Sequence, residues 1–285
     1  MVTFTMPSEL RSLAAAYPGV FYDLMLKESA GALSDVIVTK SKVPWTRSGF
    51  TSVLHTWGRQ MQHHPHIHII VPAIAFDERK KELIRPTQNG KFLVHYLPLA
   101  ARFRSRMEQA LRERHPEIYR QLNNEQTRTL SPTKQWNVNL KAVGEGKTAL
   151  RYLARYVQRS AFHPSRLLGY DKKGRVLLAC TSTKGQRSVL KLHSHEFIRR
   201  WLQHVLPKGF ARIRHYGFAS SAAKKLRLQM RAHLGELGEP LVKLPELGAH
   251  LCAHCGGELV FLRELARQRH LHPHRGPPRE LPQRP

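Results

Sequence analysis

The sequence predicts an α+β fold, in which helices pack on an antiparallel sheet of four or five strands, followed by a β-meander and a helical extension. Segments with apolar residues at every second position, typical of half-buried strands, alternate with segments whose apolar residues recur every three or four positions, typical of helices. Later in the chain, three strand-like segments separated by glycine-containing turns predict the meander.

The segments follow one another along the chain in a simple order. Strands of the main sheet are expected over residues 1–6, 49–57, 63–72, 91–97 and 135–143. Helices are expected over 8–16, with Ser8 as its N-cap, and then over 20–33, 98–111 and 149–159. The meander spans 166–192, and it precedes a helix capped by Ser194, a basic strand at 210–216 and a basic helix at 220–234.

Three regions follow from this order. Residues 1–165 form the expected main domain, and 166–235 form the meander and the basic helical extension. In the helix that begins at Ser194, the apolar residues are expected to face inward: Phe197, Ile198, Trp201, Leu202 and Val205. Residues 236–285 are rich in proline, arginine and histidine, and we expect them to be partly disordered.

Composition points to a polyanionic partner. The 285 residues carry 47 lysines and arginines against 20 acids, which gives a formal net charge of +27. Self-repulsion of this size favours a protein that binds nucleic acid. The basic residues are spread over the whole chain instead of one amphipathic helix, which argues against a membrane surface.

The chain has no sequence feature of secretion or of a membrane span. Its three cysteines are too few for a disulfide framework and suit a reducing compartment. No stretch of eighteen apolar residues and no signal-peptide pattern is present. We therefore expect a cytoplasmic, nucleoid-associated protein.

The histidine-rich strand predicts a metal site. Because side chains alternate along a strand, His66 and His68 lie on one face, with Ile67 and Ile69 on the other. Two imidazoles on one rigid face can be two ligands of a metal, although a chain with 18 histidines can also cluster them by chance. If strands 49–57 and 63–72 form a hairpin, His55 comes close to this pair.

The helix at 149–159 separates into three faces. Its apolar residues face the core, Tyr152 and Tyr156 are stacked four positions apart, and a third face carries Arg151, Arg155 and Arg159. Tyrosines at this spacing often serve only as half-buried packing residues. Beside a metal and a polyanion they gain another use, since a tyrosine can attack a phosphodiester while a cation neutralises its charge. Trp57 and Tyr96 could stack bases or belong to the core.

Several motifs, taken in order, resemble those of the two-tyrosine HUH (His-hydrophobic-His) transposases of the insertion-sequence-91 family. They are residues 54–58, the string 63–68 with its His-Ile-His, the Tyr-Leu-Ala-Arg-Tyr at 152–156, and the segments 204–210 and 212–217. The similarity covers roughly residues 1–235. It implies a metal-dependent enzyme that nicks single-stranded DNA, forms a 5′-phosphotyrosine and transfers the strand in rolling-circle transposition.

The resemblance also implies roles for individual residues. His66 and His68 match metal ligands for Mg²⁺ or Mn²⁺, although a histidine-rich site also suits Zn²⁺. His55 is the expected third ligand, with His64 and Gln158 as alternatives. Tyr152 and Tyr156 match the nucleophiles, and the residues expected to contact DNA are Arg151, Arg155, Arg159, Arg212 and Arg214.

The chain departs from the family pattern at both ends. Relatives carry a cysteine-rich segment before the first strand, whereas this chain starts at that strand, so a truncated transposase that only binds DNA is the alternative function. Near the other end, Cys252 and Cys255 resemble half of a zinc ribbon. A complete zinc site there would need two further ligands from among His270, His272 and His274.

Overall fold

The computed structural model describes residues 1–84, 94–144, 160–181 and 185–233, together with residues 148, 151 and 154. The chain divides into two compact units, Met1–Leu237 and Gly238–Pro285. All the described residues belong to the first unit. The expected disordered tail and its cysteine pair lie outside the described residues.

A five-stranded antiparallel sheet forms the centre of the first unit, and it confirms the predicted α+β class. The strand order is β11-β3-β4-β1-β7. The strands span Val2–Thr5 (β1), Gly49–Trp57 (β3), His63–Ile70 (β4), Val138–Leu140 (β7) and Ile213–Gly217 (β11). The basic strand that we expected in the extension is β11, and it pairs along β3, so the chain returns to the main sheet after the meander.

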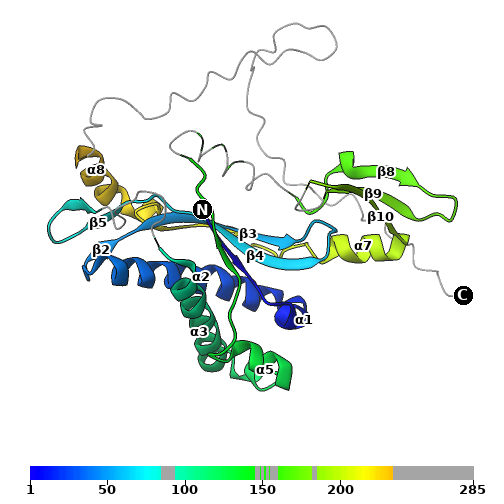
Figure 1. The fold of residues 1–285 in the computed structure, drawn as a ribbon, viewed down its shortest axis with the longest axis horizontal. Coiled ribbons are helices and arrows are strands. Elements are labelled where there is room, and N and C mark those ends of the chain that lie inside the picture. The colour runs from blue at the N-terminus through cyan, green and yellow to red at the C-terminus, as the bar shows by residue number, and fades with distance from the viewer. Residues whose placement is uncertain are drawn as a thin grey trace, which may run out of the picture. The chain divides into compact units, whose positions relative to one another are not determined.

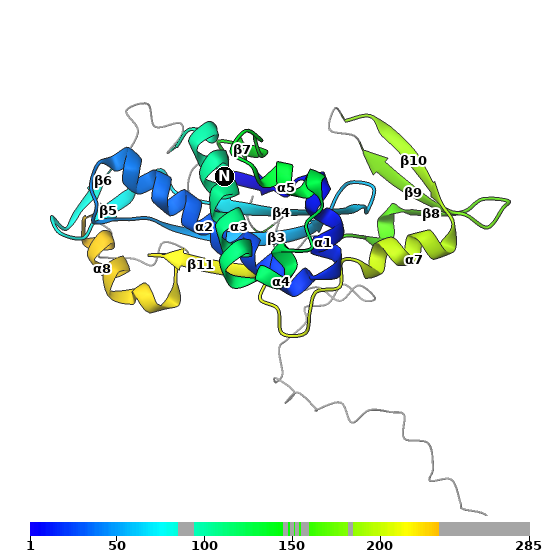
Figure 2. The same ribbon diagram turned by 90° about the horizontal axis from the view of Figure 1, so that it is seen from below.

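Helices cover one face of this sheet (Figures 1 and 2). They are α1 (Arg11–Ala16), the long α2 (Pro18–Ser41) and α3 (Tyr96–Arg114). The core lies between them and the sheet, where Phe4 of β1 meets Phe103 of α3 edge to face with ring centroids 4.9 Å apart. Ile67 and Ile69 are fully buried here, as the alternation in the histidine strand predicted.

The remaining short elements lie around this sheet. A small sheet joins β2 (Thr46–Arg47), β5 (Ala75–Asp77) and β6 (Glu82–Ile84). The short helices are η1 (Ser8–Leu10), α4 (Pro116–Tyr119), α5 (Asn124–Leu130), η2 (Pro164–Arg166) and η3 (Ser221–Ala223), and the basic helix is α8 (Lys224–His233).

The arginines of α3 are largely occupied inside the fold. Arg106 and Arg114 both pair with Glu28 of α2, whose side chain is only 3% exposed, at 3.0 Å each. Arg102 and Arg106 also pair with Asp35 of the same helix, at 2.6 and 3.0 Å. A buried carboxylate is tolerated only when it is paired, so these arginines hold α3 against α2.

The meander forms a second sheet with its own small core. Its strands are β8 (Leu167–Tyr170), β9 (Val176–Thr181) and β10 (Arg187–Leu192), and α7 (Ser194–Leu202) follows. The core is completed by Met61, which comes from the turn between β3 and β4 and packs fully buried with Val176, Leu178 and Leu192.

The same turn is also held by polar contacts. Its three successive carbonyls accept hydrogen bonds from the side chains of Arg166 (to Arg59, 2.7 Å), Arg200 (to Gln60, 2.9 Å) and His204 (to Met61, 2.9 Å). The meander and the segment after it therefore hold the β3–β4 turn, which connects the two strands that carry the histidines, by hydrogen bonds.

Some local predictions were wrong. Residues 96 and 97, expected at the end of a strand, begin α3 because the His95 ring accepts a hydrogen bond from the Leu97 amide and caps the helix; residues 91–93 lie outside the described residues. In α7 only Phe197 packs on a core, whereas Ile198, Trp201, Leu202 and the following Val205 are 47–68% exposed.

The two serine caps were also wrong. Ser8 bonds the Glu9 carboxylate instead of capping its helix, and the N-cap before α7 is His193. Among the helices of the described part of the chain, none combines the length and the apolar character that a membrane span requires.

Candidate metal centre

Strand pairing brings three histidines to one face of the sheet. His55 of β3 lies directly opposite His66 of β4, and directly opposed residues of an antiparallel pair point to the same face. His68 follows His66 by two positions and shares that face. The helices cover the opposite face, so the three imidazoles lie on the side away from the core.

The three rings form a compact cluster. One ligand nitrogen of each of His55, His66 and His68 can be chosen so that all three lie within 4.8 Å of one another. The ring centroids are 5.4 Å apart for His55 and His66, 4.9 Å for His55 and His68, and 4.8 Å for His66 and His68. This arrangement could hold a metal ion, as the sequence predicted for His66 and His68.

Hydrogen bonds orient two of these rings. The Nδ1 atom of His66 lies 2.7 Å from the His64 carbonyl oxygen. Because a carbonyl only accepts, Nδ1 carries the proton, which leaves the Nε2 lone pair free for a metal. The Nδ1 atom of His68 lies 3.1 Å from the Thr3 hydroxyl of the neighbouring strand β1. Such partners of the second ring nitrogen fix the orientation of ligating histidines.

Burial favours the neutral form of His66 and of its neighbour His64. His55 and His68 are 2% and 7% exposed. Removal from water lowers the pKa of His66, and the hydrogen bond to the His64 carbonyl opposes this only in part. The pKa of His64 is lowered to about 4, first by burial and then by its neighbour His66 and by Arg11. Neutral imidazoles are the form that binds a metal.

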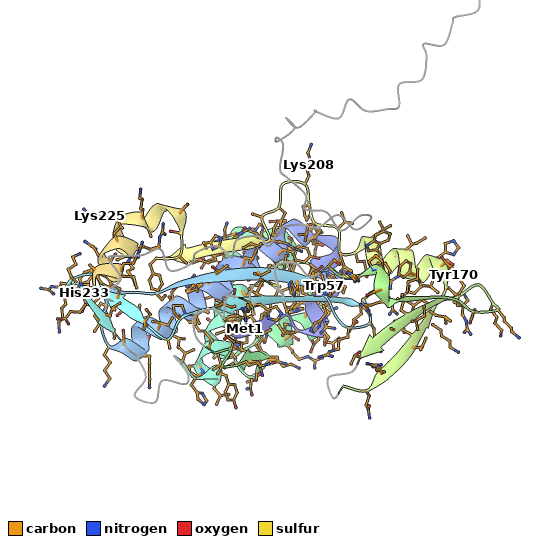
Figure 3. All side chains as sticks on the ribbon, turned by 90° about the horizontal axis from the view of Figure 1, so that it is seen from above. Met1, Trp57, Tyr170, Lys208, Lys225 and His233 are labelled. Atoms are coloured by element: carbon orange, nitrogen blue, oxygen red, sulfur yellow. The ribbon has the colours of Figure 1, made fainter. Side chains whose placement is uncertain are left out.

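Trp57 lies directly against the cluster. Its ring stacks on His55 with centroids 4.6 Å apart and an angle of 19° between the planes. The sequence allowed Trp57 to be a base-stacking or a core residue, and it is half-buried at the end of β3 (Figure 3). Its position restricts the ring of His55.

The cluster opens into a large cleft. Its volume is about 1330 Å³, and the main sheet, the β3–β4 turn and the meander all line it. The main sheet contributes the three histidines with Thr3, Thr5 and Asn139; the meander side contributes Arg166, Cys180, Thr181 and Ser188. A cleft of this size can admit an extended polymer segment as well as a metal ion.

The other predicted site residues have different placements. Arg151 is exposed, whereas Tyr152, Tyr156, Arg155, Arg159 and the alternative ligand Gln158 lie outside the described residues. Arg214 lies on the helix-covered face and pairs with Asp23 of α2 at 2.7 Å, which favours a structural role over DNA contact. Arg212 is half-buried, and its carbonyl accepts the Leu54 amide.

Sequence reasoning missed the groups that support the cluster. Thr3 stands far from the histidines in the chain, and only the pairing of β1 with β4 brings it opposite His68. The hydrogen bond from His66 to the His64 carbonyl was also missed, because the direction of a backbone carbonyl depends on local geometry that the sequence does not show. The alternation of Val2 and Phe4 could have indicated that Thr3 faces away from the core.

An antiparallel sheet with three clustered imidazoles beside a cleft defines a candidate metal-binding protein of basic charge. Residues 49–227 match the family model described as "Putative transposase" (Y2_Tnp). The chain belongs to this transposase family, as the resemblance to insertion-sequence-91 transposases predicted.

Two relatives support the same family. The chain is 32% identical over 248 residues to a "Putative transposase" of Sinorhizobium fredii, an alignment that covers 82% of this chain and 62% of the relative. It is 26% identical over 234 residues to a transposase for an insertion sequence element of Pseudomonas savastanoi pv. phaseolicola, covering 77% of this chain and 54% of that relative. The chain thus spans just over half the length of these relatives. No solved structure matches it significantly.

Proposed function

We propose that the chain nicks single-stranded DNA and transfers the cleaved strand through a 5′-phosphotyrosine, in rolling-circle transposition. The observation that carries the proposal is the cluster of His55, His66 and His68 at a cleft, in a chain that belongs to a transposase family. The net charge of +27 suits a DNA substrate.

His55, His66 and His68 would hold a Mg²⁺ or Mn²⁺ ion. The residues fit such an ion because they are clustered and because His66 is held in its neutral form with Nε2 free. When bound, a divalent cation would neutralise a non-bridging phosphate oxygen. The geometry favours His55 over His64 as third ligand, since His64 does not belong to the cluster. An all-imidazole set would also accept Zn²⁺.

The chain's own residues supply the remaining chemistry. Tyr152 or Tyr156 would attack phosphorus through its phenolic oxygen; the bond from phosphorus to the 3′ oxygen breaks, and the proton lost by tyrosine is matched by the one gained at the 3′-OH. A second tyrosine would permit a second transfer while the first end stays attached. Arg151, Arg155 and Arg159 would bind the phosphates of the strand.

Formation of a covalent adduct tests the proposal. Full-length protein is incubated with labelled single-stranded hairpin and element-end oligonucleotides and Mg²⁺ or Mn²⁺, and denaturing gels reveal the protein–DNA adduct. We expect an adduct that EDTA abolishes and that Tyr152→Phe combined with Tyr156→Phe eliminates. Each single Tyr→Phe variant should retain partial cleavage.

The controls separate chemistry from binding. The double variant should bind DNA as the unchanged chain does, because each substitution removes only a hydroxyl. An adduct that survives both substitutions would disprove the assignment of the nucleophiles. Salt-sensitive binding without cleavage of any oligonucleotide would instead support the alternative, a transposase-derived protein that only binds DNA.

A further inference from the structure

A cationic surface lies at the end of the fold away from the histidines. The turn between β5 and β6 carries three consecutive exposed cations, Arg79, Lys80 and Lys81. We call these three residues, with the neighbouring Trp45, the cationic tip. Trp45 is 55% exposed, which is unusual for a side chain with so much apolar surface.

The turn is rigidly built. The carboxylate of Asp77, a residue only 3% exposed, accepts hydrogen bonds from the amides of Arg79 (2.8 Å) and Lys80 (3.0 Å). The Lys81 amide donates to the Asp77 carbonyl at 2.9 Å, and Lys81 has a φ of 61°. The Asp77 carboxylate is therefore occupied by backbone amides, and the three exposed side chains project from a pre-organised turn.

In the described part of the chain, the three cations form no ion pair, so their side chains are available to an external anionic partner. Glu78, which directly precedes Arg79, is paired with Arg47 of β2 at 2.8 Å. Within the part of the chain that the structure describes, no carboxylate lies within 4.0 Å of a side-chain nitrogen of Arg79, Lys80 or Lys81. The positive charge here thus differs from that of α3, where arginines pair with buried acids.

Trp45 is tied to the same turn. Its carbonyl accepts the Glu78 amide at 3.2 Å, and the adjacent Thr46 pairs with Asp77 in the small sheet. Helix α8 packs by β6, with His233 at its end 6.0 Å from Phe76, and it carries the exposed Lys225 near its start (Figure 3). An exposed indole beside unpaired cations is the combination that binds single-stranded nucleic acid, by stacking and by phosphate contacts.

The cationic tip is a separate site from the histidine cleft. Arg47 and His55 are eight residues apart along extended chain, which corresponds to about 26 Å. We propose that the cationic tip binds single-stranded DNA, holding the strand by phosphate contacts to Arg79, Lys80 and Lys81 and by a base stacked on Trp45. This function does not depend on the metal centre or on strand cleavage.

Binding measurements in EDTA test the tip without any contribution from cleavage. Fluorescence anisotropy of a labelled single-stranded oligonucleotide is recorded at several salt concentrations for the full chain and for Arg79→Ala/Lys80→Ala/Lys81→Ala. Each lost phosphate contact to a single strand lowers the slope of log K against log salt by about 0.7, so we expect the slope to fall by about 2. Trp45→Ala should weaken binding about five- to a hundredfold, and Trp45→Phe should restore part of the loss.

A charge-matched control separates a site from a general loss of charge. Lys172→Ala/Lys173→Ala/Lys191→Ala removes three exposed cations from the meander and should change the slope much less. Equal losses in the two triple variants would overturn the proposal, as would unchanged binding by Trp45→Ala. An equal loss for duplex DNA or for anionic vesicles would also overturn it, because neither offers an unstacked base. Failure to form an adduct would leave these results untouched.

Discussion

Removal of His55 is the sharpest test of the third metal ligand. The buried His55 ring lies opposite His66 and within the 4.8 Å cluster, so His55→Ala removes one of three nitrogen ligands. Loss of a residue that merely orients a ligand weakens metal binding about 10–100-fold. Loss of the ligand itself should therefore weaken Mn²⁺ binding at least about 100-fold, as His66→Ala should.

Thermal unfolding converts this loss into a measurable shift. At a Mn²⁺ concentration of about 100 times the dissociation constant, bound metal stabilises the unchanged chain by about 2.7 kcal/mol. A variant that binds about 100-fold more weakly retains only about 0.4 kcal/mol at that concentration. With about 2–4 °C per kcal/mol for a unit of this size, the Mn²⁺-induced rise in Tm should shrink by roughly 5–9 °C.

The matched control is His64→Ala. The His64 ring is 5.3 Å from that of His66 but does not belong to the cluster, so its removal should leave the Mn²⁺-induced shift almost unchanged. Each variant is compared with and without EDTA, which separates metal binding from a general loss of stability. If His64→Ala and not His55→Ala abolishes the shift, the reasoning from the cluster is refuted.

Three further predictions follow from the surroundings of the cluster. Thr3→Val removes the hydroxyl beside His68 and should weaken Mn²⁺ binding, measured by calorimetry, about tenfold or more. Thr5→Val, on the same face of β1, is the control. Equal effects of the two substitutions would rule out an orienting role for Thr3. Met61→Ala should lower the free energy of unfolding by about 2–5 kcal/mol in urea titrations, and a change below this range would mean that the turn is not anchored by its side chain. The third concerns acid: the pKa of His63 is lowered to about 4 by burial and by nearby His204. Protonation thus favours the unfolded chain, so the stability is complete above about pH 6.5 and is lost as the pH falls toward 4. The shift corresponds to ~3 kcal/mol, which partial exposure reduces to roughly 1–2 kcal/mol. His63→Gln should flatten this part of the pH profile measured in EDTA, and an unchanged profile would show that other groups control it.

The sequence by itself determined the parts of the protein that depend on local periodicity. The two-residue repeat in 49–57 and 63–72 predicted β3 and β4, and the chain's alternation assigned His66 and His68 to one face. The excess of positive charge predicted a nucleic-acid partner, and the ordered motifs predicted membership of a transposase family, which the family match confirms. These inferences succeed because side-chain direction in a strand follows from position alone.

Sequence patterns did not predict the burial or pairing of helix side chains where these depend on other segments of the fold. The helix from Ser194 has an amphipathic pattern, yet Trp201 is 51% exposed, and Phe197 is the residue of this helix that packs on the small core beside it. Likewise the arginines of α3 add to the positive charge counted in the sequence, whereas in the fold Arg106 and Arg114 are paired with Glu28 of α2. Periodicity shows that a helix has an apolar face and gives no information on what covers it.

Only the tertiary structure decided how the candidate metal site is completed. Strand register placed His55 opposite His66, and the pairing of β1 with β4 brought Thr3 to His68 across 65 positions of the chain. The return of the chain as β11 and the grip of the meander on the β3–β4 turn likewise depend on contacts between distant segments. Residues that are remote in sequence meet only after the chain has folded, so a single sequence can reveal the candidate ligands but not the groups that orient them.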